Sequence, residues 1–86
     1  MLLRAITRKS LDGRGDEPGT TRAIEIEQLG DGSFLLMRYE SGDATVLTSD
    51  HWYETLEEAF EECDHVYGVG RDDWQSRDEH QDEAAK

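Results

Sequence analysis

The segment from Thr55 to Gly68 constrains the fold most, because it carries the signals of one complete amphipathic helix. Thr55 followed by Glu58 matches the capping box, in which each side chain satisfies a backbone N–H of the other residue. Apolar residues then recur at helical spacing: Leu56, Ala59, Phe60, Cys63, Val66 and Tyr67. Gly68 stands where a helix end favours positive φ. A chain of 86 residues has room for this helix and one sheet, so the apolar stripe is expected to cover one face of that sheet.

The part of the chain before the helix predicts strands. Apolar and charged residues alternate from Ile24 to Glu27, which is the period of a half-buried strand. Together with the glycine-containing turns, the pattern predicts four strands, over residues 2–9, 21–29, 34–40 and 44–48. The expected fold class is therefore α+β: an antiparallel four-stranded meander with one amphipathic helix packed on one face. Residues 1–74 are expected to form a single small domain in which Trp74 packs, and residues 75–86 a disordered acidic tail.

The turn between the second and third strands predicts their register. Asp31-Gly32 suits a two-residue type I′ turn, which would place Glu25 opposite Arg38. One face then collects Ile24, Ile26, Leu35, Met37, Tyr39 and Val46. The other face collects a second apolar set, Leu29, Phe34, Leu36 and Leu47. Because one helix cannot cover both faces, we predict that this second set is a candidate interface, either covered from within the chain, paired in a homodimer or held by another partner.

The charge of the chain favours some partners and excludes others. Its 21 acidic and 9 basic residues give a net charge of −12, a field that repels nucleic acid and anionic membranes. Four acids lie on the predicted helix: Glu57, Glu58, Glu61 and Glu62. They form two like-charge pairs spaced four residues apart, each costing about 0.2–0.5 kcal/mol, so they do not serve helix stability. We predict that they form a candidate site for a basic protein partner; the alternatives are that the charge provides only solubility or reflects adaptation to salt.

Metal binding and catalysis are not predicted. Cys63, Asp64 and His65 suggest a metal site, with His51 and His80 as further ligands, but Cys63 lies on the apolar stripe and His65 points away from it. The same geometry separates a cysteine–histidine nucleophile pair, so no catalytic residue, metal or cofactor is expected. The single cysteine, the lack of an apolar run of about 20 residues and the lack of a secretory signal favour a cytoplasmic protein.

Part of the chain has a resemblance to known proteins. A strand hairpin and a Trp precede a Thr-Leu-Glu-Glu-Ala helix, which ends in Gly and is followed by Asp-Trp. The matching positions are Trp52, Thr55 to Ala59, Tyr67-Gly68-Val69 and Asp73-Trp74. Over residues 33–75 this pattern resembles a group of short bacterial proteins of unknown function. The resemblance implies caps and core positions and therefore supports the fold, and it implies no activity.

These observations predict a small non-enzymatic protein–protein interaction module. In the first hypothesis the acidic helix face binds or inhibits a basic partner. In the alternative hypothesis the chain is a structural or accessory homodimer that uses the outer sheet face, and its charge serves solubility only.

Overall fold

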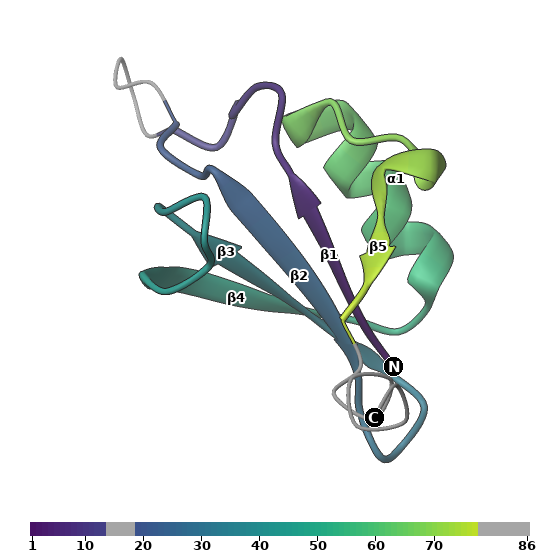
Figure 1. Cartoon of the computed structure of the whole chain (residues 1–86). Coiled ribbons are helices and arrows are strands. Elements are labelled where there is room, and N and C mark those ends of the chain that lie inside the picture. The colour runs from purple at the N-terminus through teal and green to yellow at the C-terminus, as the bar shows by residue number, and fades with distance from the viewer. Residues whose placement is uncertain (14–18, 78–86) are drawn as a thin grey trace, which may run out of the picture.

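The computed structural model describes residues 1–13 and 19–77. The elements follow in the order β1 (Leu2–Ile6), β2 (Ala23–Gln28), β3 (Phe34–Tyr39), β4 (Leu47–Tyr53), α1 (Leu56–Tyr67), the 3-10 helix η1 (Arg71–Asp73) and β5 (Gln75–Ser76). The strands form one antiparallel, twisted sheet in the order β4-β3-β2-β1-β5, and α1 packs against one of its faces (Figure 1). The predicted α+β meander with a single packed helix is confirmed.

Helix α1 has the two ends that its sequence predicts. The Thr55 hydroxyl accepts a hydrogen bond from the Glu58 N–H, and the Glu58 carboxylate accepts one from the Thr55 N–H, which completes the capping box. At the other end Gly68 adopts φ 68°, and its N–H donates to the Asp64 carbonyl. Both ends are therefore defined by interactions between residues close in sequence.

The core lies between α1 and one face of the sheet. The buried residues are Ala5, Ile24, Ile26 and Leu36 from the sheet, Ala59, Cys63 and Tyr67 from the helix, and Val69 just after it. Trp74 packs against this cluster, with its ring centroid 5.6 Å from that of Phe60, as the sequence predicts. Its indole nitrogen is buried without a hydrogen-bond partner among the described residues.

The predicted register between β2 and β3 is wrong by one residue. Glu25 lies opposite Met37 rather than Arg38, because the connection is a three-residue loop instead of the two-residue turn. The Leu29 N–H donates to the Ser33 carbonyl, and Gly32 adopts φ 88° as the last loop residue. This is a type I turn followed by a left-handed glycine, a common alternative for hairpins. The Asp31 carboxylate stabilises it by accepting the Ser33 N–H.

A shift of one residue moves every β3 side chain to the opposite face. Leu36 is therefore completely buried beneath α1, and Phe34 packs against the same core. The predicted interface of Leu29, Phe34, Leu36 and Leu47 is not one surface: the half-buried Leu29 adjoins the turn, and of the four only Leu47 is well exposed. Leu35, Met37 and Tyr39, which were predicted to lie under the helix, project from the other face instead.

Two other boundaries differ from the prediction. The strand predicted over residues 44–48 begins later and continues to Tyr53, because the chain first turns through Ala44, which has φ 58°. Gln75 and Ser76 pair with β1 and are therefore part of the sheet, not of the predicted tail. Of the rest of that tail, Arg77 donates its backbone N–H to the Leu2 carbonyl, and residues 78–86 lie outside the described residues.

Candidate functional site

The face of the sheet opposite α1 carries an apolar patch. Leu35 lies directly opposite Trp52, and Met37 follows two residues along β3, so these three side chains share one face. We call Leu35, Met37 and Trp52 the open-face patch. Trp52 is 53% exposed, and Leu35 and Met37 are half-buried. No helix of the described residues covers this face, since α1 packs on the other one.

An ion pair supports the sheet beside the open-face patch. Glu25 is buried, and its carboxylate accepts a hydrogen bond from Arg4 Nε at 2.8 Å and one from the Tyr39 hydroxyl at 2.9 Å. Burial, and then the hydrogen bond to Glu25, raise the pKa of Tyr39 to about 12. The Glu25 carboxylate therefore has its hydrogen-bond donors within the protein. The Arg4–Glu25 ion pair lies in a defined position beside the exposed apolar side chains.

The acidic residues of α1 do not form an unengaged cluster. Arg71 forms an ion pair with Glu57, and Glu58 holds the Thr55 N–H in the capping box. Glu61 is exposed, whereas Glu62 is half-buried beside β4. Burial, and after it the charge of Glu62, raise the pKa of Tyr53. Two of the four predicted partner-binding acids thus already have structural contacts, which weakens this surface as a site.

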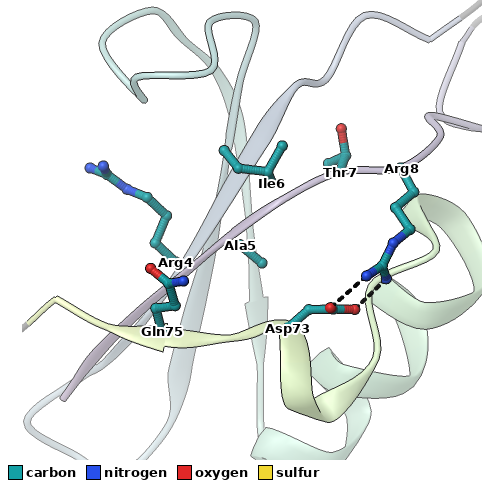
Figure 2. Close-up of a pocket in the computed structure, with 7 residues that line it drawn as sticks. All are labelled: Arg4, Ala5, Ile6, Thr7, Arg8, Asp73 and Gln75. Carbon is teal, nitrogen blue, oxygen red and sulfur yellow. Dashed lines mark hydrogen bonds and ion pairs between the residues drawn. The ribbon is translucent and has the colours of Figure 1, made fainter.

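A cavity of about 340 Å³ lies where β1 separates from the C-terminal segment (Figure 2). It is lined by Arg4, Ala5, Ile6, Thr7, Arg8, Asp73 and Gln75. Figure 2 shows Arg8 and Asp73 joined at one end, where the second guanidinium nitrogen of Arg8 lies 2.7 Å from the Asp73 carboxylate. Hydrogen bonding to Arg8 lowers the pKa of Asp73. The pair neutralises itself, so it offers no net charge to hold a ligand.

A third group of polar side chains joins the loop, the helix and the sheet. The Tyr67 hydroxyl donates to Asp12 at 2.7 Å and accepts from Arg38 Nε at 2.6 Å. Thr21 donates a further hydrogen bond to Asp12 at 2.6 Å. Burial opposes ionisation of Asp12, but its hydroxyl donors outweigh burial and lower its pKa. Every member has a partner, so this network fixes the end of α1 to the sheet.

The residues that suggested a metal site lie apart. Cys63 is fully buried, and burial raises the pKa of its thiol to about 12, whereas Asp64 and His65 are exposed. His51 lies on β4, and His80 is outside the described residues. Among residues 1–13 and 19–77, no group of three or more His, Cys, Asp or Glu side chains is placed to hold a metal ion.

Sequence reasoning missed the open-face patch for two reasons. The register error placed Leu35 and Met37 in the core, and Trp52 was not assigned to a strand. The available signal for a strand there was Thr48, Trp52 and Tyr53, whose β-branched or aromatic side chains favour strands.

No protein-family model, curated protein or solved structure matches this chain. The described part of the chain contains no helix long and apolar enough to cross a membrane. The function is therefore inferred from the surfaces of this α+β domain.

Proposed function

We propose that this chain is a small non-enzymatic interaction domain that binds a protein partner through the open-face patch. The observation that carries the proposal is the pairing of Leu35 with Trp52 on a sheet face that no described helix covers. Tryptophan is enriched among the residues that dominate binding energies, and removing its exposed ring from water is favourable. The fixed Arg4–Glu25 ion pair gives the apolar centre a polar border, which is the usual arrangement of an interface.

The titratable groups support binding rather than catalysis. Tyr39, Cys63 and Tyr67 have a pKa of about 12, so at neutral pH they are protonated and poor proton acceptors. None of them lines the cavity beside Arg8 and Asp73.

The net charge supports a basic partner. A charge of −12 attracts a cationic surface over a distance and increases its rate of encounter, while the apolar patch provides short-range affinity. In this proposal the acids of α1 contribute to that field and do not form the contact itself.

Two substitutions of similar exposure test the proposal. Trp52→Ser removes the exposed ring from the open-face patch, and Leu11→Ser removes an apolar side chain of comparable exposure from the N-terminal loop. Native protein and the two variants are immobilised, proteins from the source cells are captured, and each captured protein is purified and titrated against all three. We expect a partner whose affinity falls at least about tenfold with Trp52→Ser and is unchanged with Leu11→Ser. Equal affinity for native protein and Trp52→Ser would falsify the proposal.

A homodimer through the same face is the second candidate. It is favoured by the position of Trp52 on an outer strand, where two copies of the patch could meet across a two-fold axis. The charge of −12 on each copy opposes it, most strongly at low salt.

A further inference from the structure

Strand β4 forms one edge of the sheet, with β3 as its neighbour on one side and no described strand on the other. We propose that this edge accepts an extended, basic segment of the partner as an additional strand, so that backbone hydrogen bonds to β4 accompany contact with the open-face patch. This proposal rests on the proposed function, because it names the kind of segment that would occupy that same surface. Addition of a strand to a sheet edge is a general mode of peptide recognition.

The hydrogen-bond pattern identifies which β4 groups are available. In an antiparallel pair, residues alternate between those that bond the neighbouring strand and those that point away from it. The Leu29 N–H donates to the Ser33 carbonyl at 2.8 Å, so along β3 the odd-numbered residues bond β2 and the even-numbered residues bond β4. The β4 partners of those even-numbered residues are Ser49, His51 and Tyr53. The backbone N–H and C=O groups of Asp50 and Trp52 therefore point out of the sheet.

Against an added basic strand, this edge lacks the usual protection. Natural edge strands are blocked by charged side chains, most often Lys, by Pro or by a bulge, and the one acidic side chain of β4, Asp50, attracts a basic segment. Strand β4 contains no Lys, Arg or Pro, and its one irregularity lies at its start, opposite the step from Arg38 to Tyr39. The opposite side of the sheet is different, because β5 pairs with β1 and the Arg8 N–H donates to the Tyr67 carbonyl.

The side chains of β4 select the segment that fits. Asp50 and Trp52 lie two residues apart on the open face, so an added antiparallel strand places residues of its own opposite them. An apolar residue fits opposite Trp52, and a Lys or Arg two residues later fits opposite Asp50. Charge favours such a segment over a second copy of this chain. A second copy would add another net charge of −12, and its β4 contains no basic residue.

A synthetic peptide tests the proposal directly. The probe is an acetylated and amidated heptapeptide, Val-Thr-Lys-Thr-Val-Thr-Lys, which presents the apolar–basic spacing on one face and threonine on the other. Binding is followed by amide chemical shifts and by hydrogen exchange of the native, full-length protein. We expect the amides of Asp50 and Trp52 to become protected from exchange when the peptide is bound, since they have a new acceptor.

Backbone methylation of the peptide separates strand addition from simple hydrophobic contact. N-methyl groups on the central Lys and Val remove two of the N–H groups that face β4, and we expect at least about tenfold weaker binding, the equivalent of two lost hydrogen bonds. N-methyl groups on the last two Thr residues point away from β4, and affinity is expected to stay within about twofold of the parent. Equal affinity of the two methylated peptides overturns the proposal without any change to the protein.

Substitutions at Asp50 provide a second, independent test. Asp50→Pro removes an N–H that does not bond β3, so the fold is retained while the edge is blocked. Asp50→Asn keeps the N–H and removes the charge. We expect no detectable peptide binding with Asp50→Pro, and with Asp50→Asn a severalfold loss that is smaller at high salt. Native-like peptide binding by Asp50→Pro contradicts strand addition.

The outcomes also separate this proposal from the proposed function. If a captured partner depends on Trp52 but leaves the amides of Asp50 and Trp52 unprotected, the open face binds proteins and strand addition is wrong. If these amides become protected as the concentration of the protein alone is raised, the β4 edge binds a second copy of the chain. The proposal that it binds a basic segment is then wrong.

Discussion

Leu35 of β3 lies directly opposite Trp52 of β4, and both side chains project from the sheet face away from α1. The next residue, Leu36, lies opposite His51 on the other face and is completely buried beneath the helix. Neighbouring leucines thus have different roles, one in the candidate binding surface and one in the core. A change at one leucine should alter stability, and a change at the other should alter binding.

The two leucines provide a stability test of the register. Leu36→Ala leaves a cavity in the core, and we expect it to lower the free energy of unfolding by about 2–5 kcal/mol. Leu35→Ala should cost no more than about 1 kcal/mol, because its side chain is already partly exposed. Urea unfolding of both variants measures the difference. A larger loss for Leu35→Ala than for Leu36→Ala would support the register expected for a two-residue turn instead.

The loop glycines test the turn that sets this register. Gly32 has φ 88°, so Gly32→Ala places a side chain in the left-handed region and should destabilise the protein by about 1 kcal/mol. Gly30 is the matched control: its φ is not positive, and no heavy atom lies within 4 Å of the position where a Cβ would be placed. Gly30→Ala should change the unfolding free energy by less than about 0.5 kcal/mol, and equal losses for both variants would argue against the three-residue loop.

The helix could be predicted from sequence, and the register could not, for one physical reason. Thr55, Glu58 and Gly68 act on backbone groups within a few residues, so their effect does not depend on the rest of the fold. Asp31-Gly32 is compatible with both a two-residue and a three-residue loop. The choice depends on a side-chain contact from Asp31 to the Ser33 N–H and on which β3 residues pack under α1.

The candidate site depends on the choice between the two loops, so the open-face patch could not be predicted from the sequence. Charge is visible in the sequence, and it indicated the acidic residues of α1 as the binding site. Their structural contacts with Arg71 and Thr55 are visible only in the fold. The two-residue strand β5 is likewise too short to carry a period, and its pairing with β1 is a tertiary contact.

The Arg4–Glu25 pair should matter for stability as a unit. Arg4→Met leaves the buried Glu25 carboxylate with Tyr39 as its remaining side-chain donor, and we expect a loss of about 1–3 kcal/mol. Adding Glu25→Gln to the Arg4→Met variant removes the carboxylate charge that has lost its partner. The free energy of unfolding of the double variant should therefore fall by less than the sum of the two single losses. A double-mutant cycle in urea measures the coupling, and additive losses would show that the pair contributes only as two separate side chains.

Alkaline pH should destabilise the fold because it ionises a buried thiol and a buried phenol. Burial raises the pKa of Cys63 from 9.0 to about 12, and burial followed by the hydrogen bond to Asp12 raises the pKa of Tyr67 from 10.0 to about 12. The folded chain therefore retains protons that the unfolded chain releases, so this stabilisation is complete below about pH 9 and is lost as the pH rises towards 12. Urea unfolding from about pH 8 to pH 11 should show the decline, and Tyr67→Phe should reduce its slope. A flat profile for the native protein would contradict these folded-state pKa values.

The state of association in solution decides between a free surface and a self-associated one. If the open-face patch serves a basic partner, light scattering after gel filtration should give a monomer of 9.8 kDa at low and at high salt. A dimer that appears only at high salt would mean that the charge of −12 prevents self-association when it is not screened. In that case Trp52→Ser should return the protein to a monomer, and Leu11→Ser should not, because only Trp52 belongs to the patch. A dimer at both salt concentrations that Trp52→Ser dissociates would assign the open face to a second copy and remove the surface on which binding of a basic partner depends.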